Sequence, residues 1–334
     1  MQKVGKFAGK ALKTLMFPLV VYIIFFILSN LLTDSRFGNW DSINIILQQA
    51  VLNAMIGWSM SFNMVNGRWD FSIGSMVMIV GIIGGNLALD LDMGAHGILL
   101  FCLVFGVIFG LINAACQILI GAPTLVTSFG LLMVYETLQA IVNDGLGVRI
   151  IGSKLPIYGM YPLIFIVGII FAVIHYVVYT YTRFGHNTRS LAYNVSVAKN
   201  IGISEKKNIL GCYILCGLFA GMAAVIYASS KGSVQLSMNM TSTSLVFEAM
   251  IPVFLGIFIS RYSNLTIGIY IGSVTVKLLI SGLMSIGLSS TWQSITNGLV
   301  LFAIIAYSVN EERIKRFFSK FVHKTPKANA AESA

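Results

Sequence analysis

Charged residues are scarce in this chain. Only 10% of its 334 residues are Asp, Glu, Lys or Arg, whereas a soluble domain carries about 25%. Hydrophobic residues make up 57%, and the mean hydropathy is +0.84. A soluble protein of this length cannot bury so much apolar surface. The composition therefore excludes a soluble enzyme, a disordered chain and a nucleic-acid-binding domain, and it indicates a polytopic membrane protein.

Residues suited to catalysis or metal binding are also few. The chain has four His and four Cys; the histidines are scattered, and the cysteines lie in apolar stretches that favour simple packing. No Gly-x-x-x-x-Gly-Lys-Ser/Thr loop for nucleotide phosphates occurs. We therefore expect no catalytic site and no cofactor in this chain, and any ATP and Mg²⁺ to be bound by another subunit.

Apolar runs long enough to cross a bilayer dominate the sequence. A spanning helix needs about 20 apolar residues, and the first run is too long for a cleaved signal peptide. We predict ten spans, near residues 15–33, 43–64, 72–91, 97–121, 123–142, 161–181, 208–229, 243–260, 263–285 and 289–309.

The basic residues test this count. With the N-terminus in the cytoplasm, 17 of the 22 Lys and Arg residues fall inside and four outside, and Lys277 lies within a span. Such an excess of inside positive charge is what a correct topology produces. We therefore expect an all-α polytopic membrane protein with about ten transmembrane helices and both termini cytoplasmic. Two halves of five spans would be inverted relative to each other.

Three regions follow from this division. We expect a cytoplasmic amphipathic tail over 1–14, a transmembrane domain over 15–309 that contains the cytoplasmic loop 182–207, and a basic cytoplasmic tail over 310–334. Both tails carry apolar residues at helical spacing between lysines, which favours contact with anionic membrane lipid.

Ionisable and polar side chains inside the spans need partners. A charge at mid-bilayer costs about 2.5–3.5 kcal/mol, so Glu136, Glu248 and Lys277 are expected to pair or to reach towards the interface rather than to form a proton relay. Polar neutral residues hold helices together or line a wet path. Our candidates for a translocation path are Asn53, Asn63, Asp70, Ser72, Asn113, Thr127 and Asn297.

The loop 182–207 carries a short apolar stripe. Ala192, Val195, Ala198 and Ile201 recur at roughly helical spacing, with Asn194 or Ser196 available as a helix cap and Gly202 as its end. An exposed amphipathic helix either lies on the lipid or enters a groove on a soluble partner.

Five segments, in order, resemble one family. The stretch 182–204 (TRFGHNTRSLAYNVSVAKNIGIS) is similar to the "TrfG…A…N…A…GI" loop of ABC-transporter permeases for ribose and other simple sugars. The segments 66–75 (NGRWDFSIGS), 110–114 (GLINA), 123–130 (PTLVTSFG) and 216–224 (CGLFAGMAA) also match. The region 256–264 (GIFISRYSN) departs from the family's glycine-rich "GGtslsGG", so a contact with the ATPase there is in doubt.

The resemblance implies a permease that hydrolyses no ATP itself. It would pair with a second permease chain, identical or not, with ATP-binding cassette subunits and with an extracellular solute-binding protein, in a bacterial cell membrane. Its coupling positions would be Gly185, Asn194, Ala198 and Gly202. Permeases for nucleosides or branched-chain amino acids, and an autonomous secondary carrier, remain alternatives, and the sequence does not name the solute.

Overall fold

The computed structural model describes residues 2–32, 37–153, 155–260, 262–289, 291–293 and 295–303, with the isolated residues 306 and 310. The long helices are α1 (Gln2–Leu32), α2 (Trp40–Met64), α3 (Ile73–Asp90), α4 (Gly94–Ile120), α5 (Thr124–Ile141), α6 (Leu163–Tyr181), α9 (Glu205–Lys231), α10 (Thr243–Ile259) and α11 (Leu265–Ser285). The shorter elements are η1 (Val142–Gly145), β1 (Val148–Arg149), α7 (Arg183–Tyr193), α8 (Val195–Asn200) and β2 (Ser233–Val234).

Nine of the ten predicted spans correspond to these long helices. Eight described helices are long and apolar enough to cross a membrane, and α10 is an apolar helix of 17 residues. In the predicted tenth span, residues 291–293 and 295–303 are helical, while the rest of that span and nearly all of the tail 310–334 lie outside the described residues. The chain is therefore a multi-pass helical membrane protein.

The amphipathic tail expected over 1–14 is not a separate element. Its backbone from Gln2 onwards continues without a break into the first span, so that α1 is one helix of 31 residues. Its apolar part is Thr14–Leu32, of which only 11% is buried. Contact of its first turns with lipid stays a prediction.

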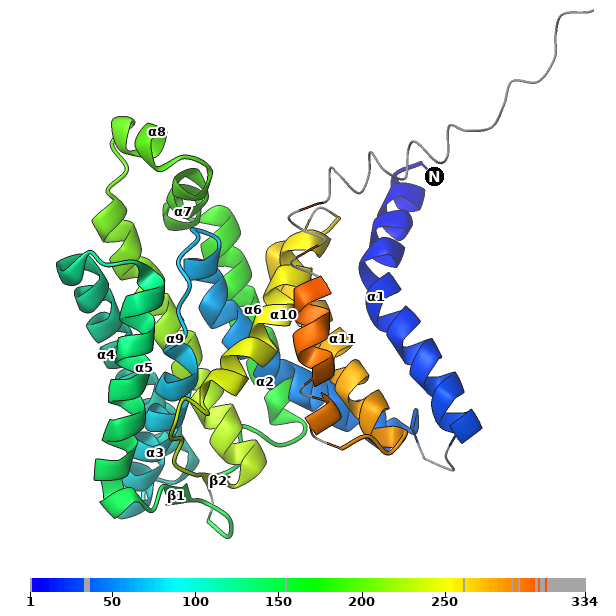
Figure 1. Cartoon of the computed structure of the whole chain (residues 1–334), viewed down its shortest axis with the longest axis horizontal. Helices are drawn as coiled ribbons and strands as arrows, with labels where there is room; N and C mark the ends of the chain where they lie inside the picture. Colours follow the sequence, from blue (N-terminus) through cyan, green and yellow to red (C-terminus); the bar gives the residue numbers. More distant parts are fainter. Residues whose placement is uncertain are drawn as a thin grey trace, which may run out of the picture.

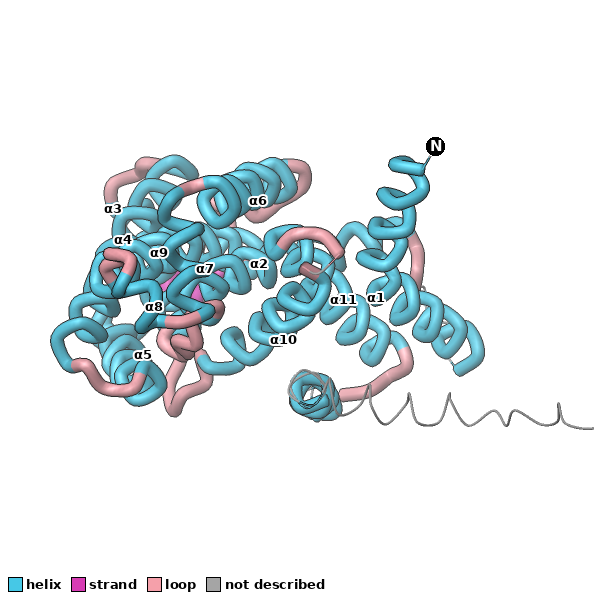
Figure 2. The backbone as a smooth tube through the Cα atoms, turned by 90° about the horizontal axis from the view of Figure 1, so that it is seen from above, coloured by secondary structure: helices cyan, strands magenta, loops and turns pink. Residues whose placement is uncertain are grey.

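Two helices form the centre of the bundle. Figure 2 shows α2 and α9 in the middle, α3, α4 and α5 on one side, and α11 and α1 on the other. Over an 18-residue stretch of each helix, 72% of α2 and 67% of α9 is buried, against 22% of α6. The helices at the periphery keep lipid-facing apolar side chains, whereas the central pair carries the packing.

Glycines allow α4 and α9 to touch along their backbones. Gly106 and Gly110 of α4 lie against Gly217 and Gly221 of α9, where a Cβ at any of the four would collide with the opposite backbone. These two Gly-x-x-x-Gly pairs thus serve packing within the chain. The third pair, Gly268 and Gly272 of α11, packs against α10.

Both α3 and α10 start after an irregular segment. Residues 68–71 follow the turn after α2, and residues 235–238 follow β2. The starts of the two helices meet, because the space that a Cβ on Gly74 would occupy is filled by the backbone carbonyl of Ser242. Asp70 and Ser242 thus lie at adjoining helix N-termini within the bundle.

A short antiparallel ribbon lies at the end of the bundle opposite α7 and α8 (Figure 1). Val148 pairs with Val234, and Arg149 with Ser233. This ribbon ties the chain after α5 to the chain after α9. The N-terminus lies at the same end as α7 and α8 (Figure 1), as the predicted topology requires.

Candidate functional site: a docking loop and a polar bundle interior

The loop 182–207 folds into two helices rather than one. Thr182 caps α7, since its hydroxyl accepts a hydrogen bond from the Gly185 N–H at 3.1 Å. The chain turns at Asn194, whose Oδ1 accepts from the Val197 N–H at 3.0 Å and caps α8. Of the two predicted caps, Asn194 is confirmed. Gly202, with φ +89°, follows α8 in a left-handed conformation that suits glycine.

The exposed face of this loop differs from the predicted stripe. Ala198 is only 1% exposed, so its prediction as an outward-facing docking residue is wrong. The break at Asn194 rotates α8 relative to α7 and turns Ala198 towards the bundle. The other three residues of the stripe, Ala192, Val195 and Ile201, are exposed as predicted, and Tyr193 at 91% and Val197 at 56% add to this apolar surface.

Glycine is favoured at two positions of the loop for different structural reasons. At Gly185 a Cβ would collide with the carbonyl oxygens of Val178 and Tyr179, so glycine lets α7 fold back onto the end of α6. At Gly202 the surroundings are open, and the positive φ is what favours glycine. A role of either residue in coupling stays a prediction.

An ion-pair cluster joins α8 to the bundle. Glu205, the first residue of α9, accepts from Lys199 of α8 at 2.6 Å and from Arg68, which precedes α3, at 3.4 Å. The Arg68 side chain is 10% exposed and that of Lys199 is 53% exposed. The docking loop is therefore connected to the irregular segment that starts α3.

A second polar cluster lies inside the bundle at the start of α3. Asp70 Oδ1 accepts from the Ser72 N–H at 2.9 Å and from the Ser72 hydroxyl at 2.6 Å. Asn113 of α4 donates to the Ser72 hydroxyl at 2.8 Å, and the Tyr135 hydroxyl of α5 donates to Asn113 Oδ1. Three of the predicted path residues are thus brought together, and the cluster fastens α3, α4 and α5.

The other path candidates are not part of this cluster. Asn53 is 3% exposed and donates from Nδ2 to the Glu248 carbonyl at 3.4 Å, and Asn63 is fully buried. Thr127 is 8% exposed and bonds back to the Pro123 carbonyl at 3.5 Å. Asn297 is half-buried and lines a cavity of about 460 Å³ with Ser244 and Glu248. Asn53 thus links α2 to α10, whereas Thr127 bonds within its own segment and neither polar side-chain atom of Asn63 has a hydrogen-bond partner among the described residues. A role of these residues in a path stays a prediction.

Glu136 bonds to the start of a neighbouring helix and forms no ion pair among the described residues. It is 5% exposed in α5, and its carboxylate accepts from the Met240 N–H at 2.8 Å, the Ser242 N–H at 3.0 Å and the Ser242 hydroxyl at 2.6 Å. A carboxylate at a helix N-terminus is stabilising. Glu136 therefore caps the start of α10, and its expected reach towards the interface stays a prediction.

The predicted pairing of the other two ionisable residues is confirmed. Lys277 of α11 donates to Glu248 of α10, and the two side chains are 14% and 26% exposed. Pairing compensates the cost of placing each charge in an apolar surrounding. The pair joins α10 to α11.

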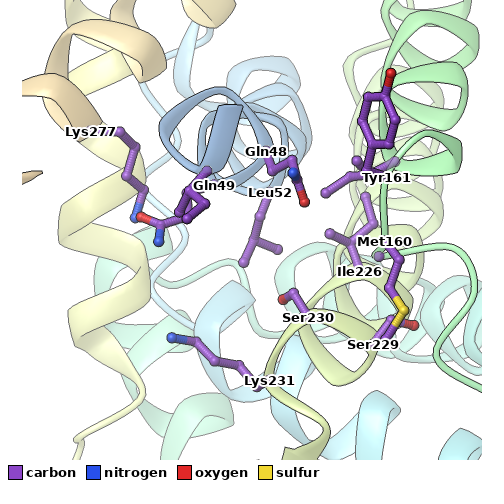
Figure 3. A pocket seen from close by; sticks show the side chains of 13 residues that line it. Gln48, Gln49, Leu52, Met160, Tyr161, Ile226, Ser229, Ser230, Lys231 and Lys277 are labelled. Carbon is purple, nitrogen blue, oxygen red and sulfur yellow. The ribbon is translucent and has the colours of Figure 1, made fainter. Parts of the chain in front are cut away.

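Lys277 also lines a polar pocket of about 400 Å³ that sequence reasoning did not find (Figure 3). Gln48, Gln49 and Lys231 face into it from α2 and α9, and the buried Ser229 lies at its wall. Residues of four separate segments meet there, so no local sequence pattern could have indicated it.

Sequence comparison assigns this arrangement to a known family. Residues 42–305 match the family described as "branched-chain amino acid transport system / permease component". The ribose import permease protein RbsC of Escherichia coli is 27% identical over 274 residues, which cover 78% of this chain and 83% of the relative. The autoinducer 2 import system permease protein LsrC of Photorhabdus luminescens is 22% identical over 281 residues, covering 82% and 83%. No solved structure matches the chain.

The apolar helices define a multi-pass membrane protein, and the family match makes it a permease component. Within that class, the chain belongs to the family of permease components of branched-chain amino acid transport systems, since the match spans most of its length. The resemblance to simple-sugar ABC importer permeases is thereby confirmed.

Proposed function

We propose that this chain forms the translocation path of an ABC importer for a sugar or a similar small polar solute, in a bacterial inner or plasma membrane. Separate ATP-binding cassette subunits hydrolyse ATP and hold its Mg²⁺, and an extracellular binding protein delivers the solute. The observation that carries the proposal is the exposed face of Tyr193, Val197 and Ile201 on a loop fixed to the spans. Apolar side chains presented in this way suit the groove of a soluble partner.

A topology of ten spans with both termini on the inner side accompanies the proposal. The helix arrangement supports inverted halves: α3 and α10 each follow an irregular segment, and their starts face each other. In such a pairing α2 corresponds to α9, and the two pack together at the centre of the bundle.

A sugar is favoured over the alternatives by the relatives. RbsC is named for ribose and LsrC for autoinducer 2, while the family description names branched-chain amino acids. The hydroxyl and amide side chains of the pocket at Gln48, Gln49 and Ser229 suit a hydroxylated solute better than an aliphatic one. A nucleoside permease remains the second candidate for the same reason.

A second permease chain completes the path. A cavity of about 570 Å³ lies between α5 and residues 238–240, and another of about 460 Å³ lies beside α10 and the helical residues 297–301. The second cavity is lined by Ser244 and Glu248 of α10. We place the partner permease, identical or not, against this side of α10.

The test is co-purification with ABC ATPases of the source organism that are co-expressed with this chain. We expect the ATPase to remain bound to the wild-type permease and to be lost from the variant Val197→Asp, because a charge would be buried in the groove. Leu146→Asp is the matched control, since Leu146 is an apolar side chain 80% exposed at the other end of the bundle. Solute uptake by the wild type must require ATP and survive collapse of the proton gradient. Uptake that stops with the gradient would instead indicate a secondary carrier.

A further inference from the structure

Glu205 lies where three segments meet. It begins α9, its Oε2 contacts the Lys199 Nζ of α8 at 2.6 Å, and its Oε1 contacts the Arg68 Nη2 at 3.4 Å. Glu205 is thus both the first residue of a central spanning helix and a partner of the docking loop. Any displacement of α8 acts first on this carboxylate.

Arg68 is held differently from Lys199. Its side chain is 10% exposed against 53% for Lys199, and among the described residues Glu205 is the carboxylate with which it forms an ion pair. Exposed ion pairs contribute little, whereas a poorly hydrated guanidinium depends strongly on its acceptor. Arg68 is therefore expected to follow Glu205 when that carboxylate moves.

The chain from Arg68 to Ser72 is short and fixed at both ends. The Arg68 N–H donates to the Asn63 carbonyl at 3.1 Å, which holds its first end to α2. The hydroxyl of Ser128 in α5 donates to the Trp69 carbonyl at 3.3 Å. Asp70 then bonds to the start of α3 through Ser72, at 2.9 and 2.6 Å. Because only one residue separates Arg68 from Asp70, a shift of Arg68 reaches the Asp70 cluster.

We propose that Arg68 and Glu205 transmit the movement of α8 to the start of α3. Arg68 is a positioning residue: it acts on α3 through the backbone of residues 68–72 and touches no solute. When an ATPase moves α8, Glu205 pulls Arg68, and the contacts of Asp70 with Ser72 and Asn113 change with it. The inference rests on the proposed function, because it requires a motor that grips α8.

The experiment measures solute transported per ATP hydrolysed by the complete complex in proteoliposomes. We expect Arg68→Met and Glu205→Gln to keep the ATPase bound and hydrolysing while the ratio falls about tenfold, the factor that corresponds to one charge-assisted hydrogen bond. The ratio for the double variant Arg68→Met/Glu205→Gln should be no lower than that of the more impaired single variant, since both changes break the same link. Lys206→Gln is the matched control and should keep the wild-type ratio, because it removes an exposed charge next to Glu205 that forms no ion pair among the described residues.

The outcomes separate this inference from the proposed function. The link between Arg68 and Glu205 would be overturned if both single variants transported as much solute per ATP as the wild type. It would also be overturned if the loss in the double variant were the product of the two single losses. If Arg68→Met fails to accumulate, Glu205→Gln decides alone, because the Glu205 side chain is 29% exposed and its loss is better tolerated. A wild-type chain that binds no ATPase refutes the proposed function itself, since the ratio is then undefined for every variant.

Discussion

The hydrogen bonds of Glu136 lead to a testable prediction about the start of α10. The variant Glu136→Ala removes the carboxylate that accepts from two backbone N–H groups, those of Met240 and Ser242, and from the Ser242 hydroxyl. Ser242 is 2% exposed, so water does not replace the lost acceptor there. We expect the first turn of α10 to loosen while the remainder of the bundle keeps its packing.

The size of the effect follows from those two N–H groups. A buried donor without a partner costs about 1–3 kcal/mol, so the pair destabilises the local structure by about 2–4 kcal/mol, Met240 being only half-buried. Since 1.4 kcal/mol is a factor of ten, amide exchange at the start of α10 should accelerate by about thirtyfold or more. Glu136→Gln retains one oxygen acceptor and should show a smaller acceleration.

Hydrogen exchange of the permease in lipid nanodiscs measures this, read on peptides that cover 237–245. Thr137→Val is the matched control, because Thr137 is the next residue of α5 and its hydroxyl bonds only to the Met133 carbonyl of the same helix. Exchange at Ser242 that is equal in wild type and Glu136→Ala would refute the assignment of Glu136 as the cap of α10.

Three further predictions concern packing and capping. Gly217→Leu should destabilise the bundle by about 1–3 kcal/mol, because the new side chain would collide with the α4 backbone, and the thermal midpoint in detergent should fall. Gly130→Ala is the control and should leave the midpoint unchanged, since the space around Gly130 is open. Lys277→Met should lower stability by about 3–5 kcal/mol, because it leaves the Glu248 charge without its partner. The double variant Lys277→Met/Glu248→Leu removes both charges and should lose much less, so equal thermal midpoints for the two variants would contradict the ion pair. Asn194→Ala should cost about 0.5–2 kcal/mol of local stability, seen as faster amide exchange in α8 and unchanged exchange in α7.

Sequence reasoning located the spans because hydropathy acts over about 20 residues at a time. Nine predicted spans coincide with described helices, and the start predicted at residue 72 is within one residue of Ile73. The same reasoning expected ionisable residues within spans to pair or to reach towards the interface, and Lys277 and Glu248 do pair. These results depend on bulk solvation rather than on detailed contacts.

Features that depend on contacts between residues far apart in the chain could not be predicted from the sequence. Glu136 finds its donors 104 and 106 residues later, and Arg68 finds Glu205 at a separation of 137 residues. The exposure of Ala198 was mistaken because a helix of six residues has too few turns to define a period, and the break at Asn194 changes its phase.

The central position of α2 has a consequence for how the protein is made. Its mean hydropathy of 1.2 is the lowest among the eight candidate spans, yet it is 72% buried. Its neighbours α9 and α11 are synthesised well over a hundred residues later, so Ser59 and Trp58 lack their partners, the carbonyls of Cys216 and Thr266, when α2 leaves the ribosome. The insertion machinery must therefore shelter α2 until those helices arrive, and a nascent chain stalled before residue 216 should crosslink to the translocon through α2 rather than to lipid.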